Sequence, residues 1–196
     1  MNTKKLTFAV MMGALGTALF AISYTVAPIA PSIAFDFSLI GVLVAGYYGG
    51  AKLGFLTGLI AGILPGIMFG PLGSGGIFGL IGLPFGKALT GMSVGLIASV
   101  VKLQQKSRSP VLAIPATFLA YVPESLFTWG YFVLLLGVTV GTAVFSTVIV
   151  KALIEIAIMS AVMVALLRNK GFSCYVRSHF LLGSIANAEQ PFSPVK

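Results

Sequence analysis

Glycine recurs at every fourth position through one apolar stretch of the chain. The stretch reads GYYGGAKLGFLTGLIAGILPGIMFG, and its glycine ladder consists of Gly46, Gly50, Gly54, Gly58, Gly62, Gly66 and Gly70. In a water-soluble helix each of these glycines would cost about 1 kcal/mol relative to alanine. Inside a lipid bilayer the same spacing is favourable, because small residues let the backbones of two helices approach closely. The ladder therefore predicts a membrane-spanning helix, with Gly54, Gly58, Gly62 and Gly66 as candidate helix-packing residues.

The ladder also predicts how this helix meets its neighbours. Four residues turn an α-helix by roughly 400°, so the glycines drift by about 40° at each step. We therefore expect the seam to wind around the helix and to contact more than one neighbour. The alternative is that glycine is simply frequent in membrane helices, which explains the number of glycines but not their register.

The composition of the whole chain is that of an integral membrane protein. Of its 196 residues, 58% are hydrophobic and only 8% are charged, whereas a soluble domain needs far more charge to cover its surface. The net charge of +8 does not indicate nucleic-acid binding, because the basic residues lie between apolar runs rather than on one face. We expect a lipid bilayer as the surroundings and no nucleic-acid partner. The single cysteine, Cys174, cannot form an internal disulfide.

Six apolar runs predict an all-α integral membrane protein, a bundle of six transmembrane helices. They lie at about residues 6–26, 38–48, 53–69, 77–101, 110–136 and 142–167. The clearest break between them is the glycine-rich segment GPLGSGG at 70–76. We expect one transmembrane domain, 1–168, and a flexible cytoplasmic tail, 169–196. A cleaved signal peptide is the alternative for the first run, although Pro28 and Pro31 make its end a poor cleavage context.

The basic residues of the loops predict the orientation. They fall at the start of the chain, at Lys52, in the tail, and in the segment 102–109 with Lys102, Lys106 and Arg108. With six spans all these segments lie on one side of the membrane, and the three segments on the other side contain no lysine or arginine. This is the positive-inside pattern, so we expect both termini in the cytoplasm.

Four ionisable residues stand inside the predicted spans: Lys87, Glu124, Lys151 and Glu155. A charge at mid-bilayer costs about 2.5–3.5 kcal/mol on insertion scales, so such residues usually face the interior of a bundle or a cavity. Their positions along the runs would bring them to one level. Lys151 and Glu155 are four residues apart on one helical face and are expected to pair. Two alternatives stay open: the four groups form a purely structural network, or Lys87 lies near a late helix start and snorkels to the surface.

Glu124 is the most suggestive of the four, because Pro123 precedes it and frees backbone carbonyls in that turn. Aromatic rings and a hydroxyl stand around it at helical spacing, which suits a planar polar ligand. Asp36, in the sequence FDFS, either caps the helix that follows it or closes over a ligand from the first outer loop. The candidate substrate-binding residues are Asp36, Lys87, Tyr121, Glu124, Thr128, Tyr131 and Lys151.

Signals of an enzyme are absent from the sequence. The one histidine, His179, lies in the tail, so the spans hold neither a histidine metal site nor a histidine catalytic dyad. No Walker A motif occurs, so the chain does not hydrolyse ATP by itself. We expect no catalytic residue, no metal site and no covalently bound cofactor. The competing hypotheses are a structural or assembly membrane protein without a small ligand, and a solitary transporter or channel.

These features together resemble the substrate-binding S components of energy-coupling factor (ECF) transporters, the bacterial and archaeal vitamin importers. The resemblance rests on a lysine-led first helix with small residues from Ala14 to Ala18, and on FDFSLIGVLVAGYYGGAKLGFLTGLIAGIL from Phe35 to Leu64. The glycine-rich segment 70–76 and six spans within 196 residues complete it. It covers about residues 4–168.

The resemblance implies a subunit of a prokaryotic cell membrane that binds a vitamin with high affinity near the outer face. The cavity would be built from the first outer loop and the fourth, fifth and sixth helices. Ala14 and Ala18 would contact a transmembrane coupling subunit, and two ATPase subunits would power import. FDFS is similar to the loop of riboflavin-type members, so riboflavin is the leading expectation for the ligand. The tail resembles nothing in the family.

Overall fold

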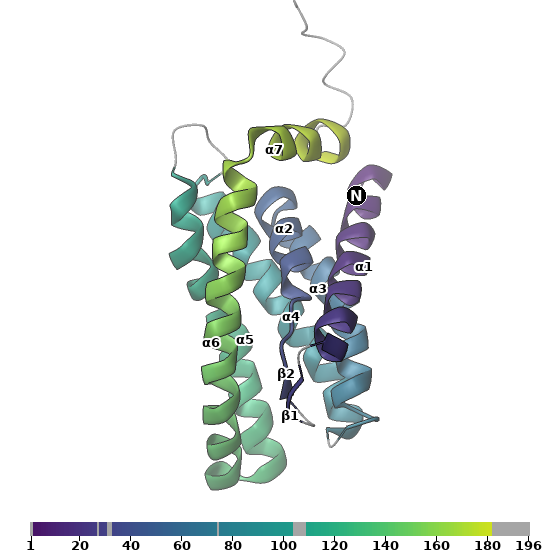
Figure 1. Cartoon of the computed structure of the whole chain (residues 1–196), viewed down its shortest axis with the longest axis vertical. Helices are drawn as coiled ribbons and strands as arrows, with labels where there is room; N and C mark the ends of the chain where they lie inside the picture. Colours follow the sequence, from purple (N-terminus) through teal and green to yellow (C-terminus); the bar gives the residue numbers. More distant parts are fainter. Residues whose placement is uncertain (1, 27, 31–32, 74, 104–108, 182–196) are drawn as a thin grey trace, which may run out of the picture.

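The computed structural model of the chain is a helical bundle, and it describes residues 2–26, 28–30, 33–73, 75–103 and 109–181. Five of its helices are long and apolar enough to cross a membrane. Along the chain the helices are α1 (Thr3–Val26), α2 (Leu39–Gly49), α3 (Ala51–Phe69), α4 (Gly76–Val100), α5 (Ala113–Leu136), α6 (Val138–Arg168) and α7 (Lys170–Val176). The antiparallel strands β1 (Pro28–Ala30) and β2 (Ile33–Ala34) and the short helices η1 (Pro110–Leu112) and η2 (Arg177–Leu181) complete it. The prediction of a helical membrane bundle is thus confirmed (Figure 1).

The second apolar run departs from the prediction of a full transmembrane helix. Its helix, α2, has 11 residues and is therefore about 16 Å long, roughly half of the hydrocarbon core of a bilayer. The chain reaches α2 through the β1–β2 hairpin and a short non-helical stretch, which we call the entry segment, residues 35–38. Figure 1 shows the hairpin at the end of the bundle opposite α7 and α2 nearer to α7. The count of six full spans is therefore not confirmed, since the described part of the chain contains five helices long enough to span a membrane and one half-length helix, α2.

The glycine ladder lies against α4. A Cβ atom added at Gly58 would stand 2.5 Å from the Ala88 Cα, and one added at Gly66 would stand 3.0 Å from the Leu80 carbonyl oxygen. An added Cβ at Gly62 would similarly meet Pro84, and one at Gly54 would meet the Gly91 backbone. Side chains are thus excluded along the seam, and the two backbones are in direct contact.

The seam faces mainly one neighbour, α4, and meets a second, α2, only at Gly54. From Gly54 to Gly70 each ladder glycine approaches α4 or the turn that leads into it, and Gly54 also approaches Gly46 in α2. A seam that winds around its own helix keeps facing one partner when the two helices cross at an angle and coil around each other. The expectation of more than one neighbour is thus met at Gly54 but not along the rest of the seam, because it did not take into account the path of the partner helix.

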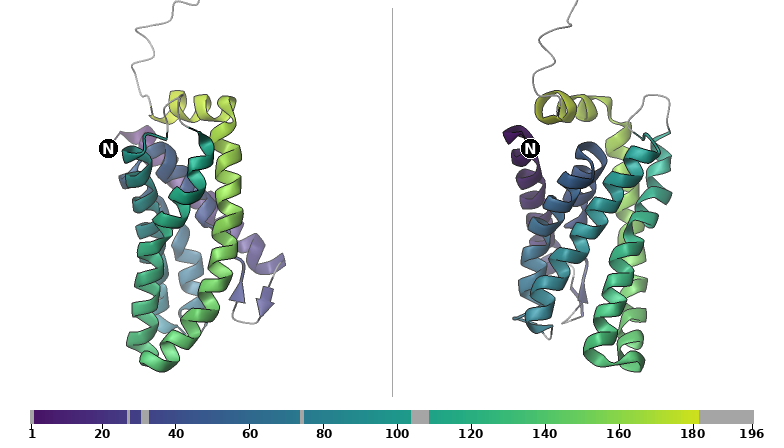
Figure 2. Two further views of the ribbon diagram at one scale, coloured as in Figure 1. Left: turned by 90° about the vertical axis from the view of Figure 1, so that its left-hand side faces the viewer. Right: turned by 180° about the vertical axis from the view of Figure 1, so that it is seen from behind.

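The tail differs from the expected flexible segment over its first part. Helix α7 and η2 continue directly from α6 and cover the end of the bundle at which the N-terminus also lies (Figures 1 and 2). Their apolar side chains repeat every four residues and face inward: the Phe172 ring packs on Tyr48 at 5.8 Å, Val176 is buried, and the Phe180 ring packs on Phe8 at 5.3 Å. This amphipathic pattern explains why the segment is helical. The remaining tail, 182–196, and the loop residues Lys106 and Arg108 lie outside the described residues.

Candidate functional site

The charged residues of the spans meet in the middle of the bundle. Lys87 lies near the centre of α4, Glu124 near the centre of α5, and Lys151 and Glu155 in α6. The entry segment brings Asp36 and Ser38 to the same place, and Thr90 joins from α4. We call these side chains the polar network: Asp36, Ser38, Lys87, Thr90, Glu124, Lys151 and Glu155. The expectation that Lys87, Glu124, Lys151 and Glu155 stand at one level agrees with this arrangement.

Lys87 forms the central ion pair of the polar network. Its side chain is buried, and its ammonium donates to the Asp36 carboxylate at 2.5 Å and to the Ser38 hydroxyl at 2.7 Å. A buried ammonium needs such partners, because removing an unpaired charge from water is costly. The alternative that Lys87 snorkels to the surface is therefore wrong, since the helix begins well before it, at Gly76.

Asp36 organises the entry segment rather than capping the first turn of α2. Its Oδ1 accepts hydrogen bonds from the Ser38 N–H at 2.9 Å and from the Ser38 hydroxyl at 2.5 Å. Its own N–H donates to Glu155 Oε1 at 2.5 Å, across 119 residues of sequence. Non-helical backbone within a membrane protein must be satisfied by protein partners, and these bonds do so where the helix is missing.

Glu124 is held differently from the other carboxylates. It is 8% exposed, and its Oε2 accepts a hydrogen bond from the Thr90 hydroxyl of α4. Gly86 of α4 leaves room for it, because a Cβ added there would lie 3.3 Å from the Glu124 Cγ. Among the described residues, the nearest ammonium groups do not reach ion-pair distance of Glu124.

Lys151 and Glu155 form the second ion pair. The Lys151 ammonium lies 3.2 Å from Glu155 Oε1 within the same helix, as their spacing predicted. The Lys151 side chain is 18% exposed and the Glu155 side chain only 7%. Glu155 therefore bridges the partly exposed lysine and the partly buried backbone of Asp36.

The other candidate residues of α5 are not part of this network. The Tyr131 hydroxyl donates to the Gly75 carbonyl oxygen at 3.4 Å, next to the start of α4. Tyr121 is partly buried against the apolar core, and Thr128 is partly buried as well. Within the described residues neither side chain is hydrogen-bonded to the polar network. A binding role for any of the candidate residues stays a prediction.

Sequence reasoning missed Ser38 and Thr90. Both are hydroxyl residues in apolar surroundings, and such residues are common in membrane helices without special roles. The available signals were positional: Ser38 lies two residues after Asp36, and Thr90 lies one helical turn after Lys87. A hydroxyl one turn from a buried charge is placed to satisfy a neighbouring carboxylate.

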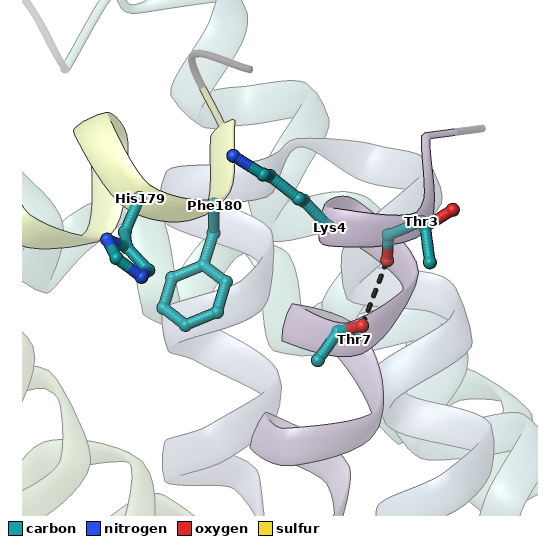
Figure 3. A pocket seen from close by; sticks show the side chains of 5 residues that line it. All are labelled: Thr3, Lys4, Thr7, His179 and Phe180. Carbon is teal, nitrogen blue, oxygen red and sulfur yellow. Dashed lines mark hydrogen bonds between the residues drawn. The ribbon is translucent and has the colours of Figure 1, made fainter. Parts of the chain in front are cut away.

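A shallow hollow lies elsewhere, between the start of α1 and the end of η2 (Figure 3). It measures about 200 Å³ and is lined by Thr3, Lys4, Thr7, His179 and Phe180. The Thr7 hydroxyl is already bonded to the Thr3 carbonyl oxygen at 3.0 Å, and the His179 ring stacks on Tyr175. The described residues contain no group of three His, Cys, Asp or Glu side chains placed to hold a metal ion. The hollow is at the α7 end of the bundle and has no contact with the polar network.

The chain was compared with known families, curated proteins and solved structures. The model of one family, described as ECF transporter, substrate-specific component, matches residues 4–167. No curated protein and no solved structure matches the chain. The family match runs from the start of α1 to the end of α6 and so includes every residue of the polar network.

Proposed function

Since this chain belongs to the family of ECF transporter substrate-specific components, we propose that it captures a vitamin or a related micronutrient for import. Membership makes it a multi-pass cell membrane protein and a transporter subunit, not an enzyme. It also implies association with the transmembrane and ATPase modules of an ECF transporter. What the chain itself contributes is recognition of the substrate.

The polar network carries the proposal. Charged side chains inside a membrane are costly, so they commonly mark substrate paths and binding sites. Here they converge from the entry segment, α4, α5 and α6, and the entry segment is non-helical where a helix would otherwise stand. Non-helical backbone at membrane depth is tolerated where it is buried in protein or lines a cavity.

In the proposed site Glu124 and Lys87 supply charged or hydrogen-bonding contacts to the ligand. Tyr121, Thr128 and Tyr131 frame it from α5. Lys151 either contacts an anionic group or stays neutralised by Glu155, and Asp36 closes the site from the first outer loop. Riboflavin is the leading candidate ligand, on the similarity of the FDFS sequence to riboflavin-type members.

The surface proposed for the coupling subunit lies on the first helix. Ala14 and Ala18 are exposed on α1, next to the exposed apolar side chains of Val10, Leu15 and Ile22. A partner helix can approach closely over small residues, because no long side chain keeps the backbones apart. This face supports a sliding contact between membrane subunits.

The test is the identity of the small molecule that co-purifies with the full chain in mild detergent, read by mass spectrometry and absorbance. A ligand of nanomolar affinity survives purification, and a flavin would also colour the preparation yellow. A Glu124→Ala variant should then lose most of the bound ligand. Ser125→Ala is the matched control, because the Ser125 hydroxyl is bonded to the Val122 carbonyl oxygen of its own helix. Unchanged ligand content in Glu124→Ala would remove Glu124 from the site.

A purely structural network is the second candidate function of these residues. It is favoured by one observation, that Lys87 and Lys151 each already have a carboxylate partner. Under this hypothesis neutralising Lys87 or Glu124 lowers the stability of the bundle without changing any binding. A folded protein that releases no small molecule and responds to no vitamin would support it.

A further inference from the structure

The polar network carries one more negative charge than positive charge when its groups are ionised. Its three carboxylates are Asp36, Glu124 and Glu155, and its two ammonium groups are Lys87 and Lys151. Each ammonium group is matched with one carboxylate, Lys87 with Asp36 and Lys151 with Glu155. The third carboxylate, Glu124, is left with the neutral Thr90 hydroxyl as its hydrogen-bonding partner.

Among the described residues, no lysine, arginine or histidine forms an ion pair with Glu124. Lys87 and Thr90 face it from α4, Tyr121 stands one turn away in α5, and the Lys151–Glu155 pair lies across in α6. Lys87 adds positive potential at Glu124, whereas Asp36 and Glu155 add negative potential, and both lysines are already paired with other carboxylates. A buried carboxylate without an ion-pair partner of its own is matched best by additional N–H donors or by a positive charge.

Aromatic side chains and two glycines of α4 lie next to Glu124. Gly82 and Gly86 of α4 carry no side chains, and they face α5 at Tyr131, Phe127 and Glu124. The Phe127 ring also packs on Phe85 at 5.3 Å. Aromatic rings beside a carboxylate suit a planar heterocycle, since the rings stack on its faces and the carboxylate accepts from its edge.

We infer that the substrate is a planar compound without a carboxylate or phosphate group, and that it presents a ring N–H or a cationic nitrogen to Glu124. This inference rests on the proposed function and adds the chemical class of the ligand. An anionic ligand would raise the excess negative charge of the polar network, whereas an N–H donor or a cation satisfies Glu124. Glu124 is then the residue that selects against acidic micronutrients.

The test compares ligands that differ in one acidic group. The purified full chain is titrated calorimetrically with riboflavin and riboflavin 5′-phosphate, thiamine and thiamine phosphate, biotin and biotinamide, and pantothenate and panthenol. For any pair that binds, we expect the protein to have at least tenfold higher affinity for the non-acidic member. Tighter binding of the acidic member would overturn the inference and leave the import function standing.

Two variants assign the selection to Glu124. Glu124→Gln keeps the shape of the side chain and removes its charge. It should lower the affinity for the bound probe about 10- to 100-fold, the range for a hydrogen bond to a charged group. Ser125→Ala should leave the affinity unchanged. If Glu124→Gln binds the same probe as tightly as the unsubstituted chain does, the inference is wrong. If Glu124→Gln does not fold, the comparison of paired probes on the unsubstituted chain decides by itself.

Mass spectrometry of the molecule released from the purified protein covers ligands outside this panel. A non-acidic ring compound with an N–H or a cationic nitrogen supports the inference. A compound with a carboxylate or phosphate group overturns the inference but leaves the proposed function standing. A folded protein that releases nothing and binds none of the eight probes overturns both the inference and the proposed function. The three results are therefore distinguishable.

Discussion

The two faces of α4 hold the bundle together by different means. Toward α3 the helix presents Pro84, Ala88, Gly91 and Gly95, and the backbones of the two helices touch. Toward α5 and the entry segment it presents Gly86, Lys87 and Thr90, which meet carboxylates. The first face is fixed by shape, because it contains no side chain that could rotate to another partner. The second is fixed by charge, and charged side chains can exchange partners when a ligand supplies new ones.

This difference separates a rigid part of the molecule from an adjustable one. Helices α3 and α4 should move as one body, since any change along their seam would create clashes or voids. The entry segment is attached to α4 by the Lys87–Asp36 pair and to α6 by the Asp36–Glu155 hydrogen bond. Ligand-dependent rearrangement is expected on that side of α4.

The largest expected effect comes from breaking the charged face at Lys87. Lys87→Met leaves the Asp36 carboxylate without its cation, and loss of one partner of a buried ion pair costs about 3–5 kcal/mol. The free energy of unfolding in detergent should fall by this amount. The double variant Lys87→Met with Asp36→Asn removes both charges but keeps an oxygen acceptor for the Ser38 N–H, so it should recover part of the loss. No recovery would mean that pairing of charge is not what fixes this face.

The glycine face should respond to a single methyl group. Gly58→Ala would place a Cβ against the backbone of Ala88, where no side-chain rotation can relieve the clash. Overpacking of this kind costs about 1–3 kcal/mol. Gly130→Ala in α5 is the control, because an added Cβ there meets nothing within 4 Å. Thermal unfolding should show Gly58→Ala destabilised and Gly130→Ala unchanged or slightly stabilised, and equal behaviour of the two would contradict a seam fixed by shape.

The smallest effect on stability is expected at Tyr131 of α5, which contacts the turn before α4. Tyr131→Phe removes one long hydrogen bond, to the Gly75 carbonyl oxygen at 3.4 Å. Side-chain hydrogen bonds between membrane helices contribute about 0.6 kcal/mol on average, so the free energy of unfolding should change by no more than about 1 kcal/mol. Ligand affinity measured on the same variant then isolates a binding role. A fall in affinity without a fall in stability would place Tyr131 in the binding site, and no fall in either would remove it.

The sequence predicted the parts of the structure that follow from local pattern. The long apolar runs gave five helices near their observed bounds, and the i, i+4 spacing gave the Lys151–Glu155 pair. The position of Lys87 and Glu124 along their runs indicated that they would reach the same level. Each of these features depends on residues within one helix, or on how far along a helix a residue stands.

The features that could not be predicted depend on distant partners. The bond from the Asp36 N–H to Glu155 joins a backbone atom to a side chain far along the chain, and no residue pattern encodes it. This bond and the Lys87–Asp36 pair hold the non-helical segment before the half-length helix α2, whereas the sequence pattern alone had predicted a full span there. The partner of the glycine ladder likewise depends on how α3 and α4 cross. Helix α7, in contrast, could have been predicted from Phe172, Val176 and Phe180, which repeat every four residues, although the tail was expected to be flexible.

Biosynthesis has to place α2 in the bilayer although α2 is too short to cross it alone. A segment recognised during synthesis as a stable span needs about 20 apolar residues, and α2 offers 11, preceded by the charged Asp36. Helix α3 follows after the single residue Gly50, whose φ of 83° reverses the chain. The two helices should therefore enter as a hairpin, with α3 supplying the apolar length that α2 lacks. A nascent chain that ends at Gly50 should leave α2 outside the hydrocarbon core, and one that includes α3 and α4 should retain it. The position of α2 in the bilayer then depends on the order of assembly, because its own apolar length is too short.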